Sequence, residues 1–373
     1  MKKLLLISFE YPTGKSYCGG VGQVVEQSRN ALLELGHEAY VLISSDFDKR
    51  RGVKLLLPDN SLKRYRSLGA FLKDYDWTGF THIIHHFVNW SGELKKIKGR
   101  RGRRPRIIYH FHSILRREKD SGFRTLNSFL YNQEKMIALA DRIICPSAYE
   151  YDNFTRYFPS FINKVAVVEN TFEGFPLNRE IVKQVRAEYG IGDNDVVSLY
   201  VGRLERIKGA HLLLQEAPVI LKRYRNAKLF FVGKWLEQDL YKKLRGLCKR
   251  FPRQLFYKRY LERERLFQYY YLSDIYINTS LSESFSLSTH EGAFCNNALL
   301  LNRLPVLEKF RDAALFFEAK ESDFTHKYET LIRNKDLRER LSARASAVAA
   351  RFMDKERMKR ELSLAISSAC LRN

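Results

Sequence analysis

The sequence is poor in the residues that cross-link small or extracellular folds. Its 373 residues include five cysteines, which are scattered, odd in number and never spaced as a C-x-x-C pair. A disulfide framework and a structural zinc site are therefore not expected, and a reducing, cytoplasmic compartment fits this pattern. The 20 glycines and 9 prolines exclude a collagen-like or linker-dominated chain.

Long hydrophobic runs are also missing. The apolar run Leu4–Ile7 stops at Ser8, and Glu10 and Pro12 follow. A secretory leader needs about 7–15 apolar residues, so the run predicts a buried first strand. No stretch approaches the roughly 18 consecutive apolar residues of a transmembrane helix, so none is expected.

Negative charge is in short supply. The chain carries 65 Lys and Arg against 42 Asp and Glu, a formal net charge of +23. Residues 95–124 alone hold 12 of these cations and 2 acids. Such an excess suits a nucleic acid, an anionic membrane surface or a phosphate-bearing substrate. The 45% of hydrophobic and 13% of aromatic residues provide ample material for packed cores and exclude a disordered chain.

Short apolar segments alternate with helix-like segments in both halves of the chain, a pattern typical of parallel sheets covered on both faces. We expect two doubly wound α/β domains, at 1–171 and 172–373, with residues 171–193 as the connection. Two placements stay open for the last helix, one with the second domain and one packed back on the first. The expected strands are 3–9, 40–44, 82–86, 106–111, 142–145 and 165–168 in the first half, and 196–201, 227–232, 254–257 and 275–278 in the second.

Two motifs of the second half follow predicted strands, where ligands of open parallel sheets bind. Arg203 and Lys208 offer a planar donor fork and a compact charge, a pair suited to a diphosphate. Glu283 and Glu291 stand eight positions apart, and a carboxylate can accept hydrogen bonds from a sugar or ribose diol. Taken alone, Arg203 and Lys208 could equally be two solvated surface cations. Two glutamates eight positions apart also occur often by chance. In the first half, the glycines of residues 19–22 would let a backbone approach an anion at a helix start.

Taken together and in order, these motifs resemble those of a retaining glycosyltransferase of the GT-B fold, in glycosyltransferase family 4. The E-x7-E element of that family resembles Glu283 to Glu291, and its G-R-L-x-x-x-K-G element resembles residues 202–209. The glycine loop and helix resemble residues 19–35, and the strand that ends in an active-site histidine resembles residues 107–112. The resemblance covers nearly the whole chain and implies two Rossmann-like domains that face a central cleft.

The resemblance also implies a role for each motif residue in moving a hexosyl group from a nucleotide-diphosphate sugar to a glycan or lipid-linked acceptor. Arg203 and Lys208 would stabilise the leaving diphosphate, and Glu283 would bind the transferred sugar. Glu291 would hold the donor ribose, and His112 would lie near the reacting sugar. The other implied donor-binding residues are Gly20, Tyr260, Phe285, Ser286 and Leu287. No metal and no further cofactor is implied.

The chain departs from the family pattern at Ser284 and Ser286, where glycine is usual, and at residues 296–298, where Gly-x-Pro is usual. An inactive nucleotide-sugar-binding protein of the same fold is therefore one alternative. A basic nucleic-acid-binding protein is another, but it would need interleaved aromatic residues or a recognised module, so no nucleic acid is expected. The basic residues of 95–124 form either a solvated loop or a contact with an anionic membrane. In the second case the protein would be a peripheral protein on the inner face of that membrane.

Overall fold

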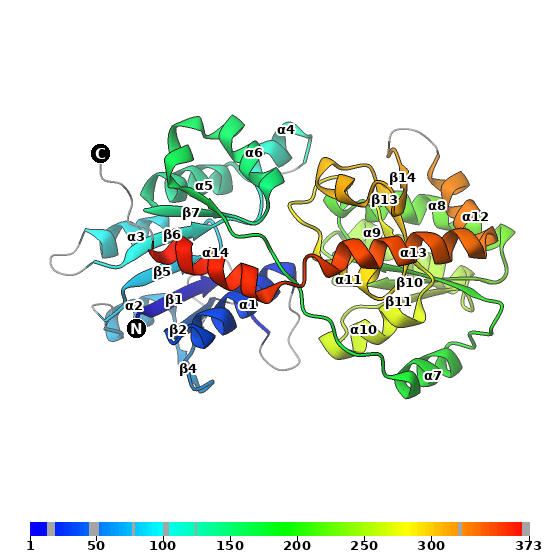
Figure 1. Cartoon of the computed structure of the whole chain (residues 1–373), viewed down its shortest axis with the longest axis horizontal. Helices are drawn as coiled ribbons and strands as arrows, with labels where there is room; N and C mark the ends of the chain where they lie inside the picture. The colour runs from blue at the N-terminus through cyan, green and yellow to red at the C-terminus, as the bar shows by residue number, and fades with distance from the viewer. Residues whose placement is uncertain are drawn as a thin grey trace. The chain divides into compact units, whose positions relative to one another are not determined.

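The chain folds into two compact α/β units. One holds residues 1–171 together with the segment from Asp354 on, and the other holds residues 172–353. The last helix, α14 (Lys355–Ser367), therefore belongs to the first unit, where it packs against α1 (Gly20–Glu34) (Figure 1). The computed structural model describes residues 1–12, 19–44, 52–76, 79–99, 104–123, 125–319 and 323–367.

An eight-stranded sheet forms the centre of the first unit, in the order β4-β3-β2-β1-β5-β6-β7-β8. Hydrophobic side chains fill both faces of the central strand β1, and Leu4, Leu5 and Leu6 are fully buried there, as the sequence predicts. The strands are β1 (Lys3–Ser8), β2 (Glu38–Ser44), β3 (Val53–Leu56), β4 (Leu62–Tyr65), β5 (His82–His85), β6 (Arg106–His110), β7 (Arg142–Cys145) and β8 (Val165–Val167).

Helices pack on this sheet between its strands. Ser147 accepts a hydrogen bond from the amide of Glu150 and so caps α6, which follows β7 directly. Besides α1 and α14, the helices are α2 (Leu68–Asp74), α3 (Ser91–Lys98), α4 (Leu115–Asp120), α5 (Asn127–Leu139) and α6 (Ala148–Tyr157), with a 3₁₀ turn at Pro159–Lys164.

A six-stranded parallel sheet forms the centre of the second unit, in the order β11-β10-β9-β12-β13-β14. The chain order reverses between β9 and β12, so the loops after these neighbouring strands open at one point. The strands are β9 (Val196–Val201), β10 (Ala227–Val232), β11 (Leu255–Lys258), β12 (Ile275–Asn278), β13 (Ala298–Asn302) and β14 (Ala314–Phe317).

Helices cover both faces of the second sheet, with a core of aliphatic and aromatic side chains beneath them. They are α7 (Arg179–Glu188), α8 (Ala210–Arg223), α9 (Gln238–Arg250), α10 (Arg263–Leu272), α11 (Leu287–Phe294), α12 (Phe324–Arg333) and α13 (Lys335–Ala350), with 3₁₀ turns at Arg206–Lys208 and Pro305–Phe310.

The structure differs from three expectations about the fold. The first sheet is not wholly parallel, because β3 and β4 pair antiparallel at one edge, where the short segment 62–65 has little apolar character. The expected connection 171–193 contains α7, which begins where Asn178 accepts a hydrogen bond from the amide of Ile181. The first turns of the basic segment 95–106 likewise belong to α3 rather than to a loop.

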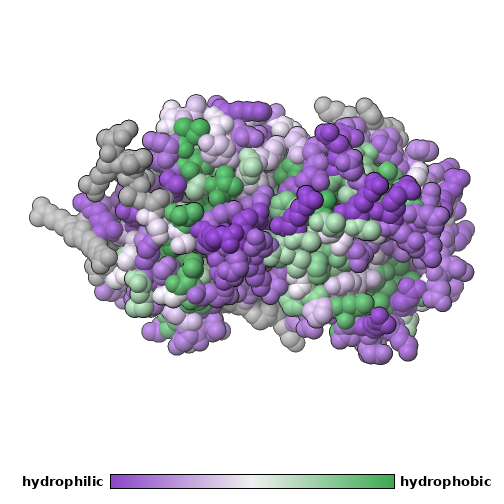
Figure 2. All heavy atoms as spheres, in the orientation of Figure 1, coloured by the Kyte–Doolittle hydropathy of each residue, from purple (hydrophilic) through white to green (hydrophobic). Residues whose placement is uncertain are grey.

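Among the described residues, none of the helices is both long and apolar enough to cross a membrane. Most of the face seen in Figure 2 is hydrophilic, and its hydrophobic residues gather in small groups between the hydrophilic ones.

Candidate active site

The loop after β9 is held against the neighbouring strand β12 by a glycine. Gly209 has a φ of +64°, and a Cβ at this position would lie 1.7 Å from the carbonyl oxygen of Thr279. Any side chain would therefore push the loop away from β12. The Tyr200 hydroxyl lies 3.2 Å from the Lys208 carbonyl, to which the Thr279 hydroxyl also donates at 3.1 Å. These contacts fix Lys208 at the carboxyl end of the sheet.

An ion pair joins the two motifs that the sequence singles out. Lys208 Nζ lies 2.9 Å from Glu283 Oε1, and both side chains are mostly buried. The Ser280 hydroxyl donates to the same carboxylate oxygen at 2.7 Å, and Asn302 in turn donates to the Ser280 carbonyl at 2.8 Å. The predicted diphosphate cation and the predicted sugar-binding acid are thus brought together, as their adjacent strands require.

Arg203 has an acidic partner two residues on. Its Nε and Nη2 both lie 2.7 Å from Glu205 Oε1, so the guanidinium is held by one carboxylate oxygen. The Tyr200 hydroxyl lies 3.2 Å from the Arg203 carbonyl. A fork fixed in this way loses less side-chain entropy when it meets an anion. Sequence reasoning missed Glu205, although its spacing from Arg203 was visible.

The start of α11 is strained at the position where the family usually has glycine. Ser286 has a φ of +68° and directly precedes the helix. The left-handed conformation costs a residue with a Cβ about 1–2 kcal/mol. Its hydroxyl accepts from Asn278 Nδ2 at 2.9 Å and lies 2.8 Å from the Thr289 hydroxyl. This network offsets the strain, and the helix amino terminus remains an anion-attracting point.

Both carboxylate oxygens of Glu291 have partners. Arg263 Nη1 lies 2.5 Å from Oε1, and the Tyr270 hydroxyl donates to Oε2 at 2.9 Å. Glu291 is 2% exposed, so an alanine here would remove the ion pair with Arg263 and would cost stability. Tyr270 and Arg263, which the sequence analysis did not select, both contact Glu291.

The remaining predicted residues of the second unit lie around α11 or follow β11. Phe285 is buried and stacks on His290, with ring centroids 4.3 Å apart and planes 5° apart. Leu287 is the first residue of α11 and is half-buried. Tyr260 lies half-buried between β11 and α10.

In the first unit, Gly20 is the exposed first residue of α1. The amide of the preceding Gly19 donates to Glu10 Oε2 at 3.1 Å. A Cβ on Gly19 would lie 2.7 Å from that same oxygen, so this glycine allows the carboxylate to approach the helix start. An acid thus interacts with the helix end that was predicted to meet a diphosphate.

Three imidazoles gather where β5 and β6 end. His112 Nε2 lies 3.2 Å from His86 Nδ1, and the His110 ring lies 4.8 Å from His86 and 5.0 Å from His112, centroid to centroid. Burial lowers the pKa of His112 to about 4, so this ring is neutral near pH 7. Burial, followed by the neighbouring His110 and His112, also holds the pKa of His86 well below its usual range. Sequence reasoning selected His112 for the site but did not predict that His86 lies beside it.

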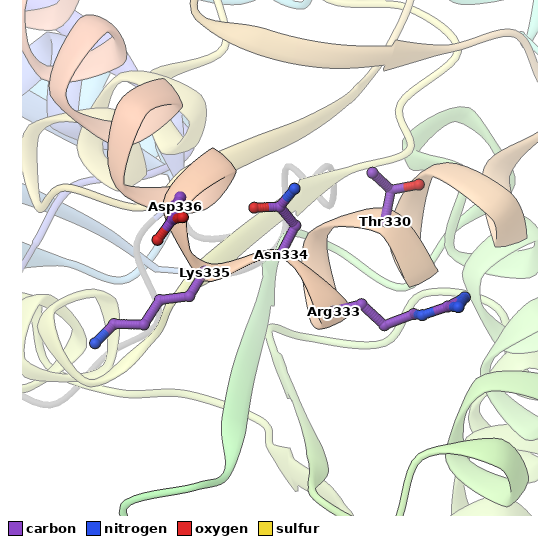
Figure 3. Close-up of a pocket in the computed structure, with 5 residues that line it drawn as sticks. All are labelled: Thr330, Arg333, Asn334, Lys335 and Asp336. Carbon is purple, nitrogen blue, oxygen red and sulfur yellow. The ribbon is translucent and has the colours of Figure 1, made fainter.

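One cavity of about 520 Å³ lies elsewhere, at the turn between α12 and α13. Figure 3 shows its five lining residues, with Arg333 and Lys335 pointing away from each other. Asn334 at this turn accepts a hydrogen bond from the amide of Leu337 and caps α13. None of the predicted site residues lines this cavity. Among the described residues, no cluster of three His, Cys, Asp or Glu suits a metal ion.

Comparison with known proteins identifies the family and the fold. Residues 18–172 match Glycosyltransferase Family 4, and residues 182–348 match Glycosyl transferases group 1. Sucrose-phosphate synthase from Thermosynechococcus elongatus has a similar structure, with a TM-score of 0.77, 14% identity and 97% and 98% of the two chains covered. Anabaena HepE in complex with UDP-glucose has a TM-score of 0.71, 16% identity and coverage of 99% and 100%.

The fold is therefore GT-B, and the protein is a glycosyltransferase. More narrowly, the chain belongs with the family 4 glycosyltransferases. It is 22% identical to alpha-monoglucosyldiacylglycerol synthase of Acholeplasma laidlawii, over 84% of this chain and 83% of that protein. It is 26% identical to alpha-galactosylglucosyldiacylglycerol synthase of Streptococcus pneumoniae, over 49% of this chain and 48% of that protein.

Proposed function

We propose that this enzyme is a retaining, metal-independent hexosyltransferase that uses a nucleotide-diphosphate sugar and a lipid-linked acceptor. The observation that carries the proposal is the ion pair between Lys208 and Glu283, which ties a cation for the leaving diphosphate to an acid for the transferred sugar. Arg203, held by Glu205, supplies a second cation from the same loop.

The charges of this site suit the cleavage of a glycosyl–phosphate bond. As the bond between the anomeric carbon and the phosphate oxygen breaks, negative charge grows on the diphosphate. Arg203 and Lys208 stabilise that charge without moving far, which is how preorganised electrostatics lowers a barrier. Two fixed cations do the work that a metal ion does in other transferases, so we propose that none is required.

Glu283 and Glu291 have different tasks in this proposal. Glu283 accepts hydrogen bonds from hydroxyls of the transferred sugar once Lys208 turns toward the diphosphate. Glu291, oriented by Arg263 and Tyr270, accepts hydrogen bonds from the donor ribose with the lone pairs that those partners leave. His112 is neutral near pH 7 and offers a hydrogen bond to the reacting sugar without adding a charge beside it.

The acceptor is proposed from two independent features. Two relatives are named as synthases of glycosylated diacylglycerols. In addition, Leu126 is 54% and Tyr131 58% exposed at α5, close in sequence to the basic segment 95–124. An exposed aliphatic and an aromatic side chain beside Lys and Arg suit the surface of an anionic membrane. We therefore propose a peripheral association with the cytoplasmic face of a membrane.

Part of the basic segment serves the fold instead. Lys98 Nζ lies 2.6 Å from Asp141 Oδ1, and Arg117 Nη1 lies 2.6 Å from the fully buried Glu150. These two cations hold neighbouring elements together, so the proposed membrane contact rests on exposed members such as Lys95, Lys96 and Lys119, which leaves fewer charges than the sequence count suggests.

The test is a screen of nucleotide sugars with diacylglycerol as acceptor, followed by NMR of the product. We expect an α-linked product from an α-linked donor, and the same rate with and without EDTA. A β-linked product would rule out retention, and a loss of activity in EDTA that Mg²⁺ restores would rule out metal independence. Binding of nucleotide sugars without transfer or hydrolysis would favour the inactive alternative.

A further inference from the structure

Basic residues also gather at the opposite edge of the first sheet, where the parallel strands begin. Lys2 directly precedes β1, His82 opens β5 and Arg106 opens β6. These three strands are neighbours, and their register pairs Leu4 with His82 and His82 with Arg106. Three consecutive strands therefore deliver a basic side chain to one point, far along the strands from His112.

A cavity of about 350 Å³ opens at this point. The lining residues that the structure describes bring three cations and a histidine but neither Asp nor Glu; they are Lys2, Thr81, His82, Arg104, Arg106, Ile366 and Ser367.

The crowding of positive charge is visible in the pKa values around the cavity. Burial, and then the charge of Arg106, lowers the pKa of Lys2. Burial, followed by the charges of Lys2 and Arg106, lowers the pKa of His82 to about 4. The carboxyl end of α14 gives partial relief, because Lys2 Nζ donates to the Ile366 carbonyl and the Ser367 hydroxyl at 3.1 Å each.

We propose that this cavity binds a phosphate group, carried either by a soluble phosphorylated compound or by a lipid headgroup. Two guanidiniums offer donor forks and Lys2 offers a compact charge, and Thr81 and Ser367 also line the cavity. The site is separate from the proposed diphosphate site, which uses Arg203 and Lys208 of the other unit. A phosphate here would contact the starts of β1 and β6 through Lys2 and Arg106, and would stabilise the first unit by offsetting the repulsion between these cations.

The first experiment measures thermal unfolding of the full-length chain in sodium phosphate and in sodium chloride of equal ionic strength. We expect saturating phosphate to raise Tm by about 2–4 °C. The double variant Lys2→Gln/Arg106→Gln should lose this shift. A matched variant, Lys63→Gln/Arg64→Gln, removes two exposed cations of β4 in the same unit and should keep it.

A second background separates this site from the donor site. Arg203→Ala/Lys208→Ala removes the proposed diphosphate cations, and we expect its phosphate shift to persist. A shift that disappears in Arg203→Ala/Lys208→Ala but remains in Lys2→Gln/Arg106→Gln would overturn the proposal, because the phosphate would then occupy the donor site. Equal shifts in the wild type and in Lys2→Gln/Arg106→Gln would overturn it as well.

Vesicles identify the source of the phosphate. Sedimentation with phosphatidic acid vesicles should be at least about tenfold weaker for Lys2→Gln/Arg106→Gln than for Lys63→Gln/Arg64→Gln if the ligand is a lipid headgroup, a ratio that corresponds to one bidentate contact. Equal sedimentation of the two double variants, together with a phosphate shift that only Lys2→Gln/Arg106→Gln loses, assigns the site to a soluble phosphate compound.

Discussion

The carboxyl ends of the two sheets carry opposite kinds of chemistry. In the second unit, each predicted charged residue has an oppositely charged partner, in the pairs Lys208–Glu283, Arg203–Glu205 and Arg263–Glu291. In the first unit, the corresponding edge presents imidazoles whose pKa burial lowers, so they are neutral near pH 7. The same position in two similar folds is thus ionic in one unit and uncharged in the other.

This difference fits a division of labour between the units. Charges that must meet a diphosphate are costly to hold in a partly dry site unless partners compensate them in the absence of the ligand. Glu283 and Glu205 provide that compensation, and under the proposed function the diphosphate would take their place. A reacting sugar develops positive charge at its anomeric carbon, and a protonated histidine beside it would oppose this. Under the proposed function, the neutral rings of the first unit would avoid that repulsion.

The ion-paired carboxyl end of the second sheet is called the ionic edge below. Of the changes considered, removal of Lys208 from this edge should have the largest effect on activity. We expect Lys208→Ala to lower kcat/KM by about 10²–10³-fold, the usual loss when one preorganised donor to developing charge is deleted. The measurement is transfer from the nucleotide sugar that the screen identifies. Lys222→Ala, at an exposed position near the end of α8, is the matched control and should keep wild-type activity. Near-normal transfer in Lys208→Ala would contradict the assignment of the ionic edge.

The ionic edge could be read from sequence because its residues follow strands at short range. Arg203 and Lys208 share one loop, and Gly209 marks the tight approach to β12. Their partners were harder to predict. Arg263 is 28 positions from Glu291 and reaches it only because α10 packs beside α11. A contact of that kind depends on tertiary packing, which no local pattern encodes.

The same limit explains the missed elements of the fold. Strongly apolar strands such as β1 are predictable because burial on both faces demands continuous hydrophobic residues. Edge strands such as β4 are exposed and charged, so their pairing follows from the neighbouring strand and not from their own composition. The histidines at the ends of β5 and β6 are visible in the sequence. Their proximity is not, because it is the parallel pairing of the two strands that brings His86 beside His112.

The stabilities of the two units should respond differently to acid. His82, His85 and His112 of the first unit have pKa values lowered to about 4 by burial, against about 6.5 in an unfolded chain. Between these values the unfolded chain binds protons that the folded unit does not, so stability falls as pH drops from about 6.5 to about 4. We expect the first unit to lose more stability than the second over this window.

Thermal unfolding at pH 7, 6 and 5, with limited proteolysis and mass spectrometry, shows which unit is cleaved first. His110→Phe tests the role of the buried histidines, because it replaces one buried, titratable ring by an apolar one. The nitrogens of His110 have no hydrogen-bond partner among the described residues. In this variant, the two units should differ less in the stability that they lose between pH 7 and pH 5. If the second unit is cleaved first at pH 5, the contrast between neutral and ionic edges does not govern acid stability.

The smallest expected effect concerns Ser286, where the ionic edge meets α11. Ser286→Gly relieves a left-handed strain of about 1–2 kcal/mol, loses two hydrogen bonds of about 0.5–1.5 kcal/mol each and gains unfolded-chain entropy of about 0.4–1 kcal/mol. The middle values of these ranges leave a net loss of about 1 kcal/mol. Ser286→Ala loses the hydroxyl but keeps the strain, so it should be the less stable of the two by urea denaturation. If Ser286→Ala were as stable as Ser286→Gly, the φ of +68° would cost no more than the about 0.4–1 kcal/mol that glycine loses through the unfolded chain, which is less than the strain assigned here.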